Sequence, residues 1–262
     1  MIREICPVIS KDEITPGTWL MWLDSPEIAR RAQPGQFVMV ACGEEAVLRR
    51  PISVHSVDHD TFALLYAVVG KGTAWLTHLK KESTLDILGP LGNGFNVIDE
   101  PSGTLSFLMI AGGIGIAPLR YLIEKVKPSC RQIILLQGAA TASKLYPKEL
   151  LPPDVSITVA TEDGTAGLKG LITDLIPTFA TTADEVFACG PMPMLKYIAQ
   201  NQTTLKLAGK PISISMEMRM ACGLGVCYGC TIRTRSGLKE VCKDGPGFNL
   251  NEVIWDEMTR LS

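Results

Sequence analysis

The pattern of apolar and polar positions divides the chain into two kinds of sequence. In the first hundred residues, short apolar runs are separated by turn signals and lie at residues 18–23, 36–42, 61–69 and 85–88. We expect only one short helix in this region, beginning after residue 72. Many short strands with little helix are typical of a small antiparallel barrel.

A different pattern follows Pro101-Ser102-Gly103. Runs typical of buried strands, at residues 107–110, 133–136, 155–160 and 185–188, alternate with helical patterns at 119–126, 168–176 and 192–200. This alternation predicts a parallel α/β sheet with helices on both faces. The predicted fold class is therefore β plus α/β. Its three segments are a barrel at residues 1–98, a nucleotide-type domain at 99–211 and a small module at 212–262.

Composition excludes several classes of protein. With 46% hydrophobic and 20% charged residues the chain is able to fold, and a net charge of −2 gives no basic surplus for binding nucleic acid. The longest nearly apolar run, residues 107–119, is shorter than the roughly twenty residues that a membrane helix needs. The N-terminus has no apolar signal-peptide core. We therefore expect a cytoplasmic protein that binds neither nucleic acid nor membrane.

Four of the eight cysteines fall within 21 residues, as Cys222, Cys227, Cys230 and Cys242. The spacing C-x4-C-x2-C with a later fourth cysteine is typical of plant-type 2Fe–2S clusters. Glycines between the cysteines let the loop bring N–H groups toward the sulfur atoms. One alternative is a structural zinc site, although such sites favour two C-x2-C pairs. Thiols without any metal are the other.

Two further motifs in the first segment are candidates for binding phosphate. Arg50-Pro51-Ile52-Ser53 offers a guanidinium for a bidentate contact, and Gly70-Lys71-Gly72-Thr73 opens the predicted helix. These residues alone are equally compatible with a capped helix and a solvated arginine.

In the second segment, Gly112-Gly113-Ile114-Gly115 joins a strand to a helix, and Cys189-Gly190-Pro191 does so again later. Such turns at strand ends favour a nucleotide site, although the first is also compatible with a tight turn in a packed sheet. We interpret the alternating Met216, Met218 and Met220 as packing residues. We assign no ligand role to the three histidines and no catalytic acid, base or nucleophile.

The order of these motifs resembles the ferredoxin–NADP reductase superfamily over about residues 1–212. The tail, residues 217–230 and 241–246, is similar to the electron-transfer subunits of NAD-dependent (type B) dihydroorotate dehydrogenases. The resemblance implies that FAD is bound by Arg50, Pro51, Ile52, Ser53, Leu65, Tyr66, Ala67, Gly72 and Thr73. It assigns NAD to Gly112, Gly113, Gly115, Cys189, Gly190 and Pro191, and a 2Fe–2S cluster to the four clustered cysteines.

Roles within those sets also follow from the resemblance. Arg50 would meet the FAD pyrophosphate, and Ser53 would lie near the reactive flavin N5. The absence of an arginine after Gln137-Gly138 favours NAD over NADP, although Lys144 leaves NADP open.

The resemblance further implies a partner, an FMN-containing catalytic subunit that oxidises dihydroorotate in pyrimidine biosynthesis. Its electrons would pass through the 2Fe–2S cluster and FAD to NAD⁺, in a heterotetramer with two of each subunit. The apolar residues Leu224, Val226 and Tyr228 would lie at the partner contact, or else only shield the cluster from water.

Two alternatives to this function remain open from the sequence. In the first, the chain is the NAD(P)H-linked electron-transfer subunit of another redox complex, of hydrogenase, sulfide dehydrogenase or transhydrogenase type. In the second, it is a binding protein without redox chemistry, whose C-terminal cysteines hold a zinc ion.

Overall fold

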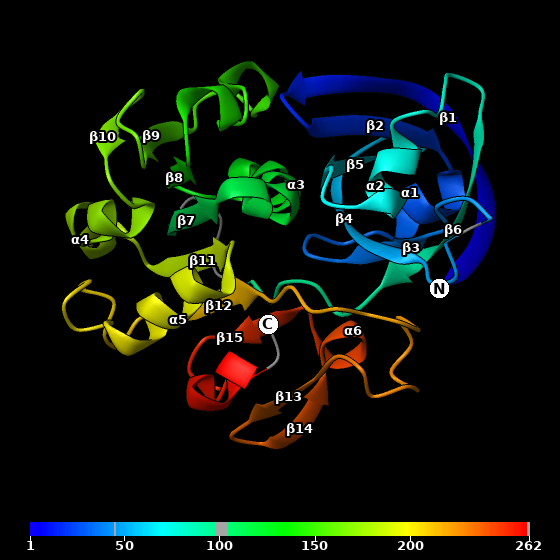
Figure 1. Ribbon diagram of the computed structural model, residues 1–262. Coiled ribbons are helices and arrows are strands. Elements are labelled where there is room, and N and C mark those ends of the chain that lie inside the picture. The colour runs from blue at the N-terminus through cyan, green and yellow to red at the C-terminus, as the bar shows by residue number, and fades with distance from the viewer. Residues whose placement is uncertain (45, 98–103, 261–262) are drawn as a thin grey trace.

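The computed structural model describes residues 1–44, 46–97 and 104–260. The first segment closes into an antiparallel barrel with strand order β1-β2-β5-β4-β3-β6, as Figure 1 shows. The strands are β1 (Ile2–Thr15), β2 (Thr18–Asp24), β3 (Phe37–Val40), β4 (Arg50–Asp58), β5 (Thr61–Ala67) and β6 (Thr84–Leu91). The predicted barrel is confirmed, and its interior holds apolar side chains from all six strands.

The expectation of a single helix in the barrel segment is wrong. Besides α2 (Lys71–Leu76), the chain forms α1 (Pro26–Arg31) between β2 and β3. The Ser25 hydroxyl caps α1 by accepting the Ile28 N–H at 3.1 Å, and a proline occupies the first turn. A helix of six residues is too short to show a clear helical period in the sequence, which is why the pattern misses it.

The second segment builds a seven-stranded sheet with order β10-β9-β8-β7-β11-β12-β15. All neighbouring pairs are parallel except β12 with β15. The strands are β7 (Ser106–Gly112), β8 (Gln132–Ala139), β9 (Ser156–Thr161), β10 (Leu168–Lys169), β11 (Glu185–Cys189), β12 (Ile212–Ser215) and β15 (Gly247–Asn249).

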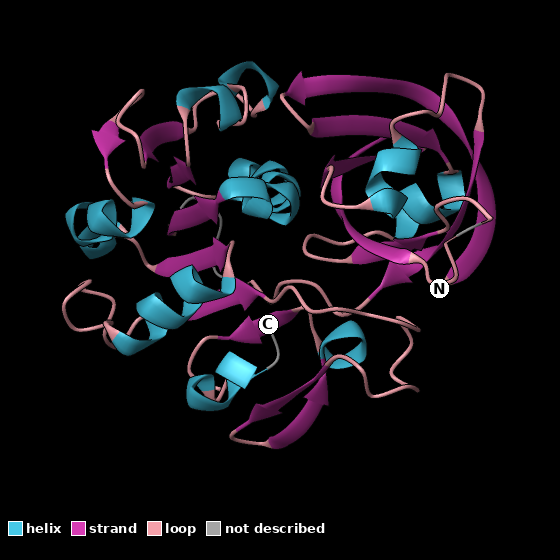
Figure 2. Cartoon of the chain, in the orientation of Figure 1, coloured by secondary structure: helices cyan, strands magenta, loops and turns pink. Residues whose placement is uncertain are grey.

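Helices cover both faces of this sheet, as predicted (Figure 2). On one face lies α3 (Ile116–Val126), and on the other lie α4 (Ile176–Phe179) and α5 (Met192–Gln200). Leu119, Leu122 and Ile123 of α3 are fully buried on the sheet, as their spacing predicts.

The helix predicted at residues 168–176 is wrong in its first half. Leu168 and Lys169 instead form β10, which pairs with β9, and a 3₁₀ turn at Ile172–Leu175 precedes α4. The physical reason is Gly170, whose φ of +137° no helix accommodates and whose N–H donates to the Thr161 carbonyl at 3.0 Å.

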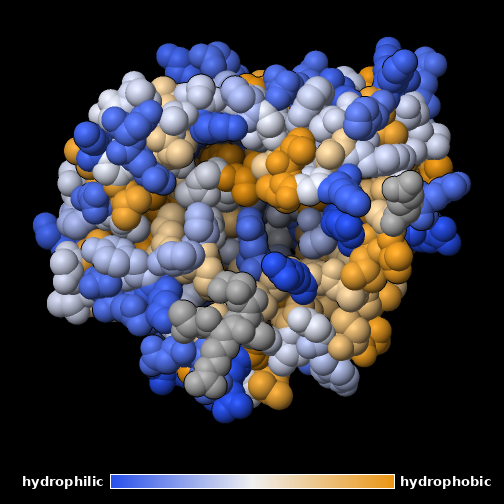
Figure 3. All heavy atoms as spheres, viewed as in Figure 1, coloured by the Kyte–Doolittle hydropathy of each residue, from blue (hydrophilic) through white to orange (hydrophobic). Residues whose placement is uncertain are grey.

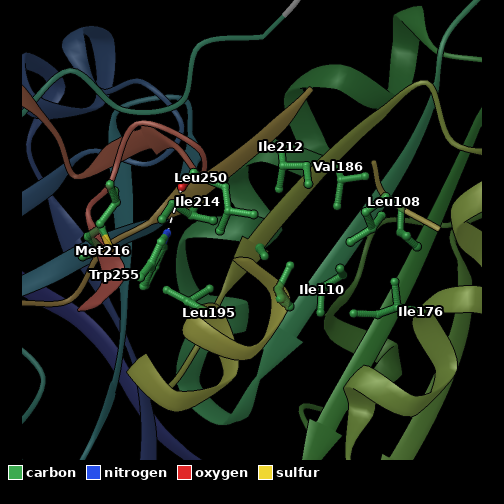
Figure 4. Packing of buried hydrophobic residues seen from close by; sticks show 14 of the residues in the cluster. Leu108, Ile110, Ile176, Val186, Leu195, Ile212, Ile214, Met216, Leu250 and Trp255 are labelled. Atoms are coloured by element: carbon green, nitrogen blue, oxygen red, sulfur yellow. Dashed lines mark hydrogen bonds between the residues drawn. The ribbon is translucent and has the colours of Figure 1, made fainter. Parts of the chain in front are cut away.

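The last segment adds a hairpin of β13 (Thr231–Thr234) and β14 (Gly237–Glu240), followed by α6 (Val241–Asp244). It also supplies β12 and β15 to the sheet, and Figure 4 shows Leu250 and Trp255 packed beside Ile214 and Leu195 in one core. The segment thus shares its core with the α/β sheet. The three-segment division remains a proposal, and its boundary at 98/99 and Pro101-Ser102-Gly103 lie outside the described residues.

Helix α3 stands between the sheet and the barrel (Figure 1). Its sheet-facing side carries the predicted apolar residues, whereas Tyr121 enters the barrel core and its hydroxyl donates to the Ala32 carbonyl at 3.0 Å. One helix therefore packs against both domains. Across the described ranges, no helix is long and apolar enough to cross a membrane.

Candidate cofactor sites

A cavity of about 680 Å³ lies between the barrel and the chain that leaves β12. Figure 3 shows this face of the molecule hollowed between the barrel and the sheet. Of the predicted flavin residues, those that line the cavity are Arg50, Pro51, Ile52, Ser53, Leu65, Tyr66, Ala67 and Thr73. Strands β4 and β5 and helix α2, which are separate in the sequence, thus bring these residues to one space.

Gly72, the remaining predicted flavin residue, lies behind Arg50. A Cβ atom at Gly72 would stand 2.8 Å from Arg50 Nε, so any side chain there would displace the guanidinium. The glycine therefore allows Arg50 to reach the cavity.

The two neighbouring arginines have different surroundings. Arg49 is tied to Asp86 by an ion pair at 2.7 Å. Hydrogen bonds from Arg3 and Arg49 lower the pKa of Asp86 to about 2, so this carboxylate stays charged. Both arginines line the cavity, but the guanidinium of Arg50 donates to an uncharged acceptor, the Leu48 carbonyl. Arg50 is therefore better placed to meet an anionic ligand than Arg49, whose charge is paired with Asp86.

The start of α2 is capped and also offers donors. The Thr73 hydroxyl accepts the N–H groups of Val69 at 2.9 Å and Gly70 at 3.3 Å. The first intrahelical bond runs from Ala74 N–H to the Gly70 carbonyl at 2.9 Å, so the N–H groups of residues 71–73 precede it. Both readings of this motif, a capped helix and a phosphate contact, fit the geometry.

The hydroxyl of Tyr66 indicates whether the cavity suits a ligand with polar groups. Its hydroxyl is a buried polar atom with no hydrogen-bond partner among the described residues, and Tyr66 lines the cavity. Burial, with the nearby Cys42, raises the pKa of the phenol, so it remains a donor. An unsatisfied buried hydroxyl costs about 1–3 kcal/mol, which a ligand oxygen would relieve. The cavity thus fits a ligand such as FAD, with polar groups along an apolar wall.

The two predicted nucleotide turns meet at the carboxyl ends of the neighbouring strands β7 and β11. A Cβ at Gly115 would stand 2.0 Å from the Cys189 carbonyl oxygen, and one at Gly190 would stand 2.9 Å from Gly112 Cα. Only glycine permits this close approach. Pro191 completes the contact, since a Cβ at Gly112 would lie 2.9 Å from its ring.

A second cavity of about 300 Å³ adjoins the first, and Leu65, Ala67 and Ile114 line both. Gly113, Lys144 and the turn between β1 and β2 complete its walls. Lys144 donates to the Pro16 carbonyl, so its ammonium bridges the two domains. The flavin-type residues and Gly113 of the nucleotide set therefore line adjoining cavities, whereas Gly112, Gly115, Cys189, Gly190 and Pro191 form the packed turns beside them and line neither cavity.

The segment at the end of β12 and after it lines the larger cavity, a role that the sequence did not predict. Residues 215–220 form one wall of the larger cavity, and Met218 and Met220 line it besides packing on the core. Glu217 is exposed to the cavity but surrounded by protein, which raises the pKa of its carboxyl. Burial and the charge of Glu217 in turn raise the pKa of the Cys189 thiol well above 9.0, so this thiol is neutral. Glu217 begins the tail motif at residues 217–230, but the motif does not show that Glu217 borders the cavity, because its place depends on the path of the chain after β12.

The four clustered cysteines are gathered by the hairpin and by α6. The hairpin pairs Thr231 with Glu240, which returns the chain so that Cys242 follows beside Cys230. The Cys242 N–H donates to Cys230 Sγ at 3.4 Å, and both residues are 2% exposed. Cys227 is exposed and Cys222 is half-buried.

Backbone N–H groups point at the sulfur atoms, as the glycine spacing predicts. Leu224 N–H donates to Cys222 Sγ at 3.3 Å, and Gly225 N–H donates to Cys242 Sγ at 3.1 Å. Burial alone would raise the pKa of Cys222, but hydrogen bonds from Leu224, Val226 and Cys227 lower the pKa to about 6. Such donors stabilise thiolates, the form that ligates iron.

The glycines of the loop fix its path. Gly223 and Gly225 have φ values of +72° and +75°. A Cβ at Gly223 would stand 2.6 Å from Met39 Cγ, which places this loop directly on barrel strand β3. The loop therefore rests on the barrel.

The arrangement of the thiols bears on which metal they suit. In the part of the chain that the structure describes, no three or more His, Cys, Asp or Glu side chains converge on one metal position. The cysteines instead form two contacting pairs, Cys222 with Cys227 and Cys230 with Cys242. A single zinc ion needs four ligands around one centre, whereas a two-iron cluster takes two thiolates on each iron. The arrangement favours the two-iron cluster.

Solved structures confirm the fold. The chain superimposes with a TM-score of 0.86 and 30% identity on a structure of an NADH-dependent reduced ferredoxin-NADP oxidoreductase studied for flavin-based electron bifurcation, over 98% of this chain and 92% of that one. A ferredoxin NADP⁺ reductase from Neisseria gonorrhoeae, with bound FAD and NADP, shares the fold at a TM-score of 0.65 and 18% identity, over 78% of this chain and 91% of that one. Barrel, sheet and cysteine loop together define a flavin- and iron–sulfur-dependent oxidoreductase of the ferredoxin–NADP reductase type.

Sequence comparison narrows this class to one family. The model for the iron–sulfur cluster binding domain of dihydroorotate dehydrogenase B matches residues 217–254, which hold all four clustered cysteines. The dihydroorotate dehydrogenase B (NAD⁺) electron transfer subunit of Geobacillus thermodenitrificans is 34% identical over 259 residues, covering 96% of this chain and 98% of that protein. The corresponding subunit of Caldanaerobacter subterraneus is 37% identical over 230 residues, covering 86% and 89%.

The chain belongs to the family of dihydroorotate dehydrogenase B electron transfer subunits. Its cofactors are FAD and a 2Fe–2S cluster, with NAD as the nucleotide. The resemblance identified in the sequence is confirmed.

Proposed function

We propose that this chain carries electrons from dihydroorotate, oxidised on a partner subunit, through its 2Fe–2S cluster and FAD to NAD⁺. The observation that carries the proposal is the continuity of two sites along one short segment. Residues 215–220 form a wall of the flavin-type cavity, and Cys222 begins the cluster loop only two residues later. Electron transfer falls off with distance, so adjacent cofactors are what an electron-transfer subunit requires.

The chain's own residues have distinct tasks in this proposal. Bound FAD supplies the conversion between one-electron and two-electron transfer. Arg50 and the first turn of α2 would hold its pyrophosphate, and the Tyr66 hydroxyl would donate to a ligand oxygen. The Ser53 hydroxyl would face the reactive edge of the ring and orient the flavin for the nicotinamide.

The nucleotide turns would hold NAD against that edge. Gly112, Gly113 and Gly115 would let the dinucleotide approach the backbone, and Gly190 and Pro191 would border the nicotinamide, next to the buried and neutral Cys189 thiol. The charge of Glu217 raises the pKa of the Cys189 thiol, so this carboxylate also affects the electrostatic potential beside Gly190 and Pro191.

The partner is a dihydroorotate dehydrogenase catalytic subunit, and we propose that it carries FMN and assembles with this chain as two of each. The cluster loop is suited to meet it. Leu224, Val226 and Tyr228 are 39%, 69% and 69% exposed, and Val226 and Tyr228 flank the exposed Cys227 in the chain. Apolar side chains that face water at a redox centre are typical of an interface core.

The experiment is to co-express the chain with a dihydroorotate dehydrogenase catalytic subunit and to supply dihydroorotate and NAD⁺ without oxygen. We expect dihydroorotate-dependent formation of NADH by the purified complex. An intact complex, loaded with flavin and iron, that forms orotate with a dye but never NADH would contradict the proposal.

A second candidate is favoured by the structural match over almost the whole chain to the ferredoxin-NADP oxidoreductase. In that case the chain would serve a complex that exchanges electrons between NADH, NADPH and ferredoxin. The complex purified with the chain from its own cells, assayed with NADPH, ferredoxin and NAD⁺ in place of dihydroorotate and NAD⁺, separates the two, because only the second candidate predicts NADH formation there.

A further inference from the structure

His55 occupies an unusual position between the two domains. It lies on barrel strand β4, two residues after Ser53, and is 1% exposed. Its Nδ1 lies 2.9 Å from the Ala117 carbonyl of α3, and its Nε2 lies 2.9 Å from the Tyr146 hydroxyl. A carbonyl only accepts, so Nδ1 carries the proton and Nε2 accepts from Tyr146.

The imidazole is held neutral in this one tautomer. Burial is the main cause that lowers the pKa of His55 to about 3. The nearby Arg120 cation acts in the same direction, and the hydrogen bond to the Ala117 carbonyl opposes it. Both ring nitrogens are therefore used for hydrogen bonds, one to each of two segments of the nucleotide domain.

A second set of bonds runs beside His55. Arg120 of α3 donates to the Ser56 hydroxyl at 2.7 Å and to the Leu150 carbonyl at 2.9 Å. Glu124 accepts from Ser56 at 2.9 Å and from Arg120 at 2.6 Å. Strand β4, helix α3 and the segment 146–150 are thereby linked by buried or half-buried polar groups, at the place where α3 faces the barrel in Figure 1.

These contacts adjoin both cofactor sites. Ser53 and Ala117 line the larger cavity, and Tyr146 lines the smaller one. Ala117 lies in the first turn of α3, directly after the Gly113–Gly115 turn. We propose that His55 is a positioning residue, which fixes the flavin strand β4 against the nucleotide turn and so sets how the nicotinamide meets the flavin. This inference rests on the proposed function.

Packing alone does not account for a histidine here. Burying an imidazole is costly unless both nitrogens are hydrogen-bonded, and an apolar side chain would fill the same space without that requirement. Hydrogen bonds restrict distance and direction more closely than apolar contacts do. A displacement of about 1 Å between reacting groups is able to lower a rate by about a hundredfold.

The test compares Tyr146→Phe and His55→Leu with the parent chain in the FAD-loaded holoprotein. The readouts are the single-turnover rate of flavin reduction at saturating NADH, the KM for NADH, and the long-wavelength absorption of the stacked nicotinamide–flavin pair. We expect the reduction rate to fall roughly tenfold to a hundredfold and the absorption band to weaken, with little change in KM or FAD content. Tyr146→Phe removes one hydroxyl only and keeps the test decisive if His55→Leu does not fold.

Conservative variants separate positioning from stability. His55→Asn retains a donor for the Ala117 carbonyl, and His55→Gln retains an acceptor for Tyr146, so each should recover part of the rate. His59→Leu is the matched control, because His59 lies in the turn between β4 and β5. Its side chain is exposed and contacts the neighbouring Asp58.

Folded His55→Leu and Tyr146→Phe proteins that are less stable but are reduced by NADH at the parent rate would overturn the inference. If NADH does not reduce the flavin of the parent chain itself, the proposed function fails, and this inference fails with it.

Discussion

The cluster loop and the flavin-type cavity are built in opposite ways. All four cluster cysteines come from one stretch of 21 residues, and glycines with positive φ direct N–H groups at the sulfur atoms. The cavity instead combines β4, β5, α2 and the segment 215–220, which meet only because the barrel and the sheet pack together. The first site depends on local geometry and the second on the relation between domains, so mutations should affect them separately.

The largest expected effect follows from Cys227→Ser. We predict complete loss of the 2Fe–2S cluster with nearly full retention of FAD, because Cys227 is exposed in the loop and lines neither cavity. Iron, sulfide and flavin contents of the purified protein are the measurement.

Cys130→Ser is the control, since this cysteine lies far along the chain from the loop and its thiol contacts the Lys127 carbonyl. Full iron content in Cys227→Ser would contradict the ligand assignment, and loss of FAD would contradict the independence of the two sites.

A smaller effect is expected from Leu224→Asp, which tests the outer face of the loop. A charge in an interface core should weaken binding of the catalytic subunit about thirtyfold or more, while NADH–dye activity of the chain alone persists. Leu238→Asp is the matched control, because Leu238 is 64% exposed in the adjacent hairpin.

Co-purification and titration calorimetry measure the binding. An intact complex with a damaged cluster would show that Leu224 shields the cluster and does not contact the partner.

On the cavity side, Ser53→Ala should slow flavin reduction by NADH by about tenfold, the equivalent of one hydrogen bond. FAD affinity should change little, because Arg50 and α2 remain. Stopped-flow reduction and flavin titration compare the two quantities, with Ser129→Ala, in the 3₁₀ turn that follows α3, as the control. An unchanged reduction rate would remove Ser53 from the reactive edge.

The last prediction concerns stability and pH, and it does not affect the electron-transfer rate directly. The pKa of His55 falls from 6.5 to about 3 on folding, so between these values the unfolded chain binds the additional proton. The stability from neutral His55 is therefore present above pH 6.5 and decreases as the pH falls toward 3, by up to about 1.4 kcal/mol per pH unit. Denaturation of the parent and His55→Leu chains at several pH values measures this slope. Equal slopes would show that His55 is not buried and neutral.

The comparison also explains what the sequence predicts well. Strands β2, β3, β5 and β6 and the 192–200 helix were predictable because apolar periodicity reflects burial along one element, whereas no predicted apolar run corresponds to β1 or β4. Helix α1 was missed because it has six residues, and β10 was mistaken for helix because the apolar pattern continues across Gly170, whose positive φ prevents a helix there. The joining of β12 and β15 to the sheet depends on pairing between distant segments, which periodicity does not record.

The same distinction holds for the sites. The cysteine spacing predicts a local loop, and the structure gathers those residues as two pairs. No role for Glu217 or His55 could be predicted from the sequence, because their importance comes from the neighbours that the fold provides, Cys189 for Glu217 and Ala117 with Tyr146 for His55. Assignment of the individual cofactor-binding residues remains a proposal that the variants above address.

Electron flow between the two regions is tested most directly in the assembled complex with and without Cys227. The measurement is anaerobic NADH formation from dihydroorotate and NAD⁺ by the parent complex and by the Cys227→Ser complex, alongside NADH–dye activity of each. The account predicts NADH formation by the parent, its loss in Cys227→Ser, and NADH–dye activity in both. Equal NADH formation by both complexes, with iron absent from the variant, would contradict transfer through the cluster.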